Sequence, residues 1–136
     1  MRSMGFLQNS GAGRQGMVTT TRVAGQAAEE QALAHLLAAG LVLVQRNYRT
    51  AGRGGGEIDL IMREPDGTLV FVEVRSRAGA SHGGAGASIG ATKRRRIIFA
   101  AQCYLMRSAQ PPACRFDAVL IEQGRLQWLR AAFDAG

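Results

Sequence analysis

The stretch Glu57-Ile-Asp-Leu-Ile-Met-Arg63, followed by Pro65-Asp66-Gly67 and then by Thr68-Leu-Val-Phe-Val-Glu-Val-Arg75, decides the fold of this chain. Two runs rich in β-branched and apolar residues flank a turn sequence, which is typical of a β-hairpin. The second run is almost continuously apolar and is interrupted by Glu73. A central strand buried on both faces has this composition, so we expect the second run to lie inside a sheet.

Helices and further strands are expected on both sides of this hairpin. Residues 25–39 are strong helix formers that end at Gly40, and a second helix is expected over residues 92–106. Further strands are expected over residues 41–49, 116–122 and 126–129. The glycine-rich stretches 51–56 and 76–90 are interpreted as a turn and a loop. The predicted fold is α/β, a mixed central β-sheet flanked by α-helices in the order αβββαββ.

The length of 136 residues fits one globular domain, which we place over residues 23–136. Residues 1–22 are rich in Gly, Ser, Thr and Gln and show little periodicity, so we expect a disordered N-terminal arm. This arm lacks the apolar core of a secretory signal. Met17 is a candidate alternative start, because the patterned sequence begins soon after it.

The composition points to a basic protein of a reducing compartment. Seventeen Lys and Arg residues oppose ten Asp and Glu residues, giving a formal charge of +7, and Lys93 is the one lysine. Two cysteines, Cys103 and Cys114, do not make a disulfide framework, and no Cys/His spacing resembles a zinc site. No apolar run approaches the roughly 20 residues of a membrane span. We therefore expect a cytoplasmic protein with a polyanionic partner and no membrane association.

The charges are unevenly distributed along the chain. Residues 57–75 carry five acidic against two basic side chains, whereas residues 76–107 carry six basic side chains and no acidic one. An acidic centre between basic flanks suits a cation site surrounded by a phosphate-binding surface. The alternative is a pair of ordinary polar strands beside an arginine-rich helix.

Strand alternation brings two carboxylates together. Side chains alternate between the faces of a strand, so Asp59 and Glu73 point the same way if the hairpin pairs in register. A carboxylate in so apolar a run needs a charge, a metal or hydrogen bonds to compensate it. In one interpretation Asp59 and Glu73 bind Mg²⁺ or Mn²⁺. In the other, Glu73 pairs with Arg75 or a neighbouring arginine in a structural bridge.

The first expected helix adds a third acid. Leu33, Leu36 and Leu37 define its predicted buried stripe, and Glu29 lies closer to the centre of that stripe than Glu30 does. Glu29 is therefore the acid that can reach the Asp59 and Glu73 pair, where it would hold a cation-bound water or a second ion. His35 falls on the opposite, polar face and is expected to be exposed to solvent.

Several ordered motifs resemble the YraN-like family of small bacterial proteins. They are Gly25-x-x-x-Glu29-x-x-Ala32, Gly56-Glu-Ile-Asp59-Leu-Ile, Val70-Phe-Val-Glu73-Val-Arg75-x-Arg77, Lys93 and Arg115-Phe-Asp117. That family is similar to the restriction-endonuclease-like fold, and especially to archaeal Holliday-junction resolvases. The resemblance covers about residues 22–134 and implies a nucleic-acid-binding protein.

The resemblance also implies roles for single residues. In that superfamily the acid of the second strand matches Asp59, the Glu-x-Lys motif matches Glu73-Val74-Arg75, and the helical acid matches Glu29. This chain departs from the pattern at Arg75, which stays protonated and so can clamp a phosphate but cannot act as a general base. Lys93, at the start of the second helix, is the candidate amine from elsewhere in the chain.

A nucleic-acid-binding surface is predicted from the distribution of basic residues. Its candidate members are Arg46, Arg49, Arg53, Arg77, Lys93, Arg94, Arg95 and Arg96. Residues 93–96 start a helix, where their charges oppose the helix dipole, so local stability does not explain their placement. A solvated helix face is the alternative. Aromatic residues are sparse, which favours contact with the phosphate backbone over stacking on bases.

The leading hypothesis is a nucleic-acid-binding protein and candidate Mg²⁺- or Mn²⁺-dependent endonuclease that acts on structured or branched DNA. The second is a non-catalytic module that binds nucleic acid or recruits a partner on a degenerate nuclease fold, and the third is a structural protein that its charges merely keep soluble. A homodimer is expected by analogy with the resolvases. Asp117 is expected to form a structural pair with Arg115, while Trp128 and Phe133 cap the core. His82 is interpreted as an exposed loop residue.

Overall fold

The computed structural model describes residues 12–52, 54–77 and 89–135, with side chains of the first helix from Gly25 onward. Its elements are α1 (Ala12–Ala38), β1 (Val42–Arg49), β2 (Glu57–Arg63), β3 (Leu69–Arg77), α2 (Ala91–Leu105), β4 (Cys114–Glu122) and β5 (Arg125–Phe133). The predicted order αβββαββ is confirmed. Arg53 and the loop residue His82 lie outside the described residues.

The five strands form one mixed sheet in the order β1-β2-β3-β4-β5. The β1–β2, β2–β3 and β4–β5 pairs are antiparallel, whereas β3 and β4 run parallel. The parallel pair requires a crossover, and α2 supplies it. β3 lies in the middle of the sheet, and its apolar residues from Leu69 to Val72 are buried, as the sequence predicted, while Val74 is half-buried.

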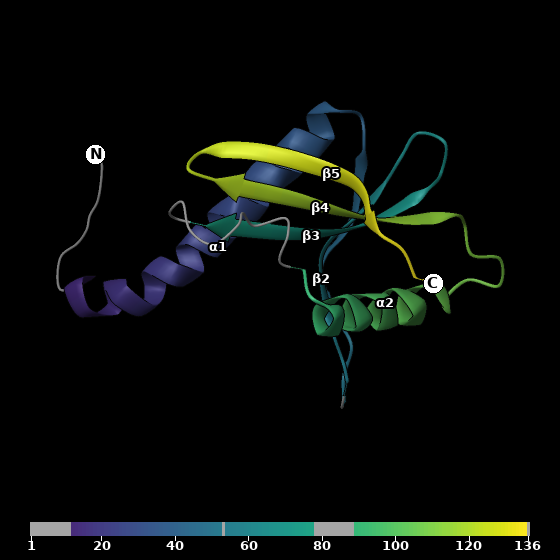
Figure 1. Ribbon diagram of the computed structural model, residues 1–136, viewed down its shortest axis with the longest axis horizontal. Coiled ribbons are helices and arrows are strands. Elements are labelled where there is room, and N and C mark those ends of the chain that lie inside the picture. The colour runs from purple at the N-terminus through teal and green to yellow at the C-terminus, as the bar shows by residue number, and fades with distance from the viewer. Residues whose placement is uncertain (1–11, 53, 78–88, 136) are drawn as a thin grey trace.

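The two helices cover opposite faces of this sheet, which gives three layers (Figure 1). Side chains of β3 alternate between the two layers of core, as do those of Leu60, Ile61 and Met62 in β2. The core on the α1 side contains Ala32, Leu36, Met62, Val70 and Val72. The core on the α2 side contains Ile61, Phe71, Ile97, Ala100 and Phe116. Glu73 shares the strand parity of Phe71 and therefore lies on the α2 side.

Helix α1 differs from its prediction in two ways. It begins at Ala12 rather than near Gly25, and its first turns project beyond the sheet (Figure 1). The helix thus takes in the second half of the stretch expected to be disordered, while residues 1–11 lie outside the described residues and their disorder stays a prediction. Leu37 was expected in the buried stripe but is 47% exposed. The buried stripe instead runs through Ala28, Ala32, Leu33 and Leu36, so Leu37 lies beyond its edge.

A fully buried carboxylate, that of Asp117, organises the β4–β5 edge. It accepts hydrogen bonds from Arg115 Nε at 2.8 Å and Nη2 at 3.0 Å, from Trp128 Nε1 at 2.9 Å and from the Ala131 backbone N–H at 2.9 Å. The expected pair with Arg115 is confirmed. Ala131 has φ of 52°, at an irregularity in the β4–β5 register. Because Asp117 satisfies this bulge, β5 continues to Phe133 instead of ending near Leu129 as predicted.

The structure also bears on the cysteines, on membrane-spanning helices and on His35. Cys103 and Cys114 are both free thiols. Within residues 12–52, 54–77 and 89–135, no helix is long and apolar enough to cross a bilayer. His35 is exposed, as expected, although its ring meets that of Trp128 edge to face with centroids 5.9 Å apart.

Replacement of Asp117 by Asn should destabilise the fold by about 3 kcal/mol, because an amide leaves buried donors and a charged guanidinium without their acceptor. Urea unfolding followed by circular dichroism measures this. Asp134→Asn, at an exposed carboxylate, is the matched control and should change the free energy of unfolding by less than about 0.5 kcal/mol. Equal effects of the two substitutions would refute the structural role of Asp117.

Candidate functional site

The site lies where β2 and β3 separate. Their antiparallel register extends from Arg63–Leu69 to Leu60–Val72, and β3 continues beyond this point alongside β4. The Val74 N–H therefore needs another acceptor, and Asp59 Oδ2 accepts its hydrogen bond at 2.8 Å. This bond fixes the Asp59 carboxylate against β3, as strand parity predicted.

Glu73 lies beside Asp59 and is 5% exposed. Its Oε2 is 3.6 Å from Lys93 Nζ of α2 and 3.9 Å from Arg75 Nη1 of its own strand. Its Oε1 is buried and has no hydrogen-bond partner among the described residues. The structure thus brings Asp59, Glu73, Arg75 and Lys93 together and leaves one carboxylate oxygen unsatisfied.

Burial raises the pKa of Glu73 to about 8, and the negative charge of Asp59 adds to this effect while Lys93 and Arg75 oppose it. The pKa of Asp59 is also raised, mainly by burial, against the hydrogen bonds from Val74 and Glu73. The pair therefore carries less than two negative charges near neutral pH unless a cation compensates it.

A cavity of about 230 Å³ adjoins this pair, and Lys93 lines it. The other lining residues are Gly55, Gly56, Glu57, Arg96 and Ile97. The residue before β2 touches the first turns of α2 here, because a Cβ added at Gly56 would clash with the Arg96 carbonyl oxygen. Only glycine allows this approach. The cavity is therefore bounded by the Glu57 carboxylate on the strand and by the basic side chains of Lys93 and Arg96 on the helix.

Glu29 approaches the same region from the α1 side. Its side chain is 20% exposed, against 61% for Glu30, which confirms that it is the more inward acid. Burial raises the pKa of Glu29, with a further contribution from the charge of Asp59. Arg46 Nη2 lies 4.0 Å from Glu29 and donates to Glu30 at 2.7 Å. Arg46, predicted to bind nucleic acid, is thus engaged with the acids of α1.

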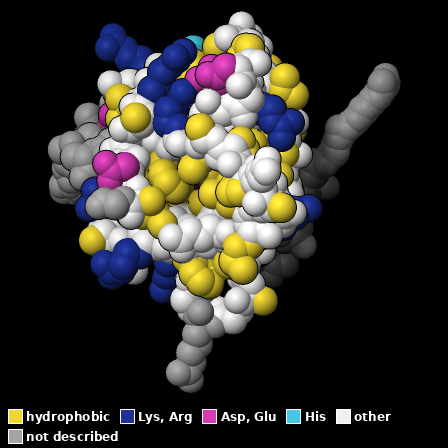
Figure 2. Space-filling model, turned by 90° about the vertical axis from the view of Figure 1, so that its right-hand side faces the viewer, with side chains coloured by type: hydrophobic (Ala, Val, Ile, Leu, Met, Phe, Trp, Pro, Cys, Tyr) yellow, Lys and Arg dark blue, Asp and Glu magenta, His cyan; other side chains and the backbone are white. Residues whose placement is uncertain are grey.

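The other predicted binding residues divide into separate groups. Lys93, Arg94, Arg95 and Arg96 are all exposed on the first turns of α2. Arg49 Nε is 3.4 Å from Glu57, and Arg77 is half-buried at the end of β3. Basic side chains also lie around an apolar centre on one face of the molecule, with few acidic ones among them (Figure 2). The consecutive, exposed members of the predicted basic surface, residues 93–96, therefore lie together on α2.

The Asp59–Glu73 pair fits a divalent cation. Two carboxylates and an unsatisfied buried oxygen are hard oxygen donors, and Mg²⁺ keeps several waters while binding to one or two carboxylates. In the part of the chain that the structure describes, no group of three His, Cys, Asp or Glu residues is spaced to hold a metal. Among the described residues, Asp59 and Glu73 are therefore the pair that would hold such a cation, and a role for Glu29 beside them stays a prediction.

Sequence reasoning missed two parts of this site. One is the Asp59–Val74 hydrogen bond, which depends on the point where the two strands separate. The other is the contact of Gly56 with Arg96, for which the glycine-rich stretch before β2 was the available signal. Both features concern backbone positions, which the pattern of side chains does not encode.

The Glu73→Gln variant tests the raised pKa. The folded protein retains at Glu73 a proton that the unfolded chain releases above its ordinary pKa of 4.5, so this group's contribution to stability is lost as the pH rises from about 4.5 to about 8. With chelator present, Glu73→Gln should raise the melting temperature by several degrees at about pH 9 and hardly at all at about pH 5. Glu122→Gln is the control on β4. A Glu73→Gln effect independent of pH would contradict the shift.

Comparison with known proteins identifies the family of this chain. The model of the uncharacterised protein family UPF0102 matches residues 28–121. A UPF0102 protein of Acidovorax sp. (strain JS42) is 75% identical over 116 residues, covering 85% of this chain and 88% of the relative. One of Paracidovorax citrulli is 68% identical over 135 residues, covering 98% of this chain and 100% of the relative. The YraN-like resemblance is confirmed, and the chain belongs to the uncharacterised protein family UPF0102.

Proposed function

We propose that this protein binds nucleic acid and hydrolyses its phosphodiester bonds with the help of Mg²⁺ or Mn²⁺ held by Asp59 and Glu73. The observation that carries the proposal is the buried Glu73 carboxylate, whose Oε1 lacks a partner among the described residues while a second carboxylate lies beside it. The resemblance to restriction-endonuclease-like resolvases favours structured or branched DNA as substrate.

The contrast with Asp117 supports a functional interpretation of Glu73. Both carboxylates are buried, but Asp117 accepts hydrogen bonds from a guanidinium, an indole and a backbone N–H. A carboxylate that serves stability is satisfied in this way. Glu73 faces two cations at 3.6 and 3.9 Å and another acid, so its environment does not stabilise the charged form. Such unfavourable burial is typical of sites that bind a ligand or react.

Three basic residues of the chain, Lys93, Arg96 and Arg75, would orient the phosphate of the substrate. Lys93 and Arg96 line the cavity and place positive charge where a phosphate would enter it. Arg75, near Glu73, adds a permanent charge that stabilises the additional negative charge of the transition state. The cation supplies Lewis acidity toward the phosphodiester and the attacking water. The superfamily motif has a lysine where this chain has Arg75, and Lys93 places an amine near Glu73 in its stead.

A non-catalytic nucleic-acid-binding module is the second candidate. Arg75 at the motif position favours it, because a guanidinium cannot exchange a proton as an amine can. The pair of carboxylates without a third acid favours it too, within residues 12–52, 54–77 and 89–135. The two candidate functions share the same binding surface and cation site. They differ only in whether the protein cleaves the nucleic acid that it binds.

Binding of the cation should be visible without any substrate. Millimolar Mn²⁺ should raise the melting temperature of the parent protein at about pH 8 by several degrees, because the cation compensates two buried carboxylates. Asp59→Asn and Glu73→Gln should each abolish this rise, whereas Glu122→Gln should keep it. Manganese electron paramagnetic resonance gives the stoichiometry. A rise of the same size in all variants would remove Asp59 and Glu73 from the cation site.

Cleavage is measured with labelled four-way-junction, duplex and single-stranded DNA in the presence of Mg²⁺ or Mn²⁺. Asp59→Asn and Lys93→Gln should each lower the rate at least a hundredfold, and Arg63→Gln, an exposed arginine at the opposite end of β2 from Glu57, should leave it unchanged. Tight, salt-sensitive binding with no cleavage by the parent would establish the non-catalytic candidate instead. Cleavage that survives the double variant Asp59→Asn/Glu73→Gln would refute the proposed site.

A further inference from the structure

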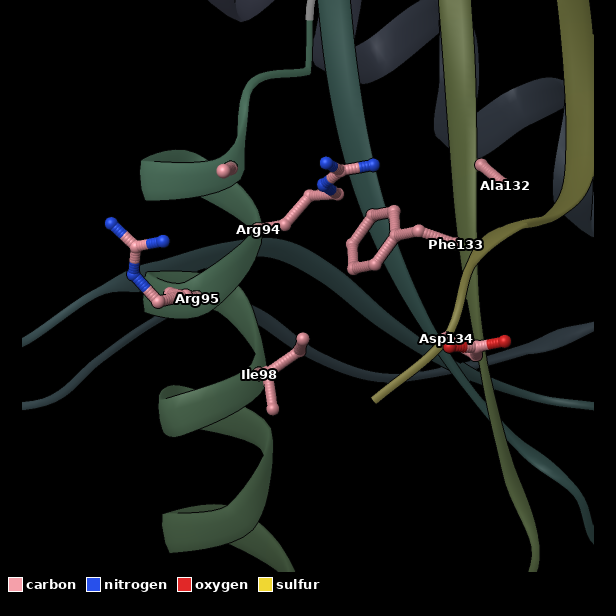
Figure 3. Close-up of a pocket in the computed structure, with 7 residues that line it drawn as sticks. Arg94, Arg95, Ile98, Ala132, Phe133 and Asp134 are labelled. Atoms are coloured by element: carbon pink, nitrogen blue, oxygen red, sulfur yellow. The ribbon is translucent and has the colours of Figure 1, made fainter. Parts of the chain in front are cut away.

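A second cavity, of about 410 Å³, lies on the other flank of α2. Arg94, Arg95 and Ile98 line it from the helix, and Phe133 and Asp134 line it from the end of β5. Arg94 and Phe133 point toward one another across it (Figure 3). The cavity exceeds the roughly 300 Å³ at which small-molecule sites begin. It shares no lining residue with the cavity next to Glu73.

The first turns of α2 therefore divide their basic side chains between two cavities. Residues three apart in a helix share a face, so Lys93 and Arg96 project together toward the Glu73 side. Arg94 projects toward β5 instead, whereas Arg95 also lines the second cavity but turns its guanidinium away from Phe133, where Nη2 donates to Thr92 Oγ1 at 3.2 Å (Figure 3). One run of four basic residues thus connects the carboxylate pair with a second site.

The second cavity combines an aromatic surface with positive charge. The Phe133 ring stacks on Phe116 with centroids 5.0 Å apart and an interplanar angle of 18°, which holds it in place at the cavity wall. Ile98 adds a half-buried apolar side chain. Two arginines oppose the single carboxylate of Asp134 among the described lining residues. A ligand that fits has a flat apolar part for Phe133 and Ile98 and an anionic part for the arginines.

We propose that this cavity binds one unpaired nucleotide of the substrate strand, with its base against Phe133 and Ile98 and its phosphate against Arg94, while Arg95 adds positive charge at the rim. The inference rests on the proposed function and specifies its substrate as DNA with an unpaired segment next to the cleavage site. A base in a duplex is stacked and paired, so its face cannot reach a side chain in a cavity. An acidic peptide satisfies the arginines but offers no flat ring to Phe133.

The test is fluorescence anisotropy of the full chain with labelled single-stranded, blunt-duplex and forked DNA. Phe133→Leu, and separately the double variant Arg94→Gln/Arg95→Gln, should each weaken binding of single-stranded and forked DNA about tenfold or more and that of blunt duplex less than about threefold. Phe133→Tyr retains the ring and should restore binding. Arg63→Gln is the charge-matched control. The arginine variants do not touch the core, so they test the cavity even if Phe133→Leu unfolds.

The outcomes separate this inference from the proposed function. If the parent binds no DNA, the proposed function fails together with its extension. If the parent binds DNA and the cavity variants bind all three substrates as the parent does, the inference is wrong while the proposed function stands. Displacement of DNA by poly-glutamate from the parent, but not from the arginine variant, would assign the cavity to acidic peptides and overturn the inference. Loss confined to single-stranded and forked DNA supports it.

Discussion

The separation of β2 from β3 beyond the Leu60–Val72 pair is the constraint on which the candidate site depends. β3 remains paired with β4 as far as Arg77, so its backbone stays extended after its other partner has left. A buried N–H without an acceptor is costly, and the carboxylate of Asp59 supplies the acceptor for Val74. The same bond that completes the hydrogen bonding of the sheet therefore places one acid beside Glu73.

Two acidic residues of the central strands, Asp117 and Glu73, show that burial alone does not reveal the role of a side chain. Asp117 and Glu73 are both inside, on neighbouring strands, and both have an arginine within reach. Asp117 meets well-directed donors and joins β5 to the sheet. Glu73 meets a second carboxylate, and its pKa rises to about 8 because the charged form is poorly compensated. The number and geometry of donors distinguish the two, and the distinction is visible only once the strands are assembled.

The fold was predictable because its elements depend on local patterns. The hairpin turn, the apolar β3 and the order of helices and strands follow from the period of the side chains, and strand parity was enough to put Asp59 near Glu73. The roles of individual arginines were not predictable. Arg46 meets Glu30 because of how α1 crosses β1, and the face that Arg94 occupies depends on the rotation of α2 about its axis. Packing between layers sets both, and no single segment encodes it.

The close approach of Gly56 to Arg96 has a consequence for how the site can change shape. Main chain touches main chain there, so no rotamer change can bring the strand and the helix closer together. At this point the separation of strand and helix is set by atomic radii. The backbone at one end of the cavity is therefore fixed, and adjustment to a ligand falls to the exposed side chains of Lys93 and Arg96.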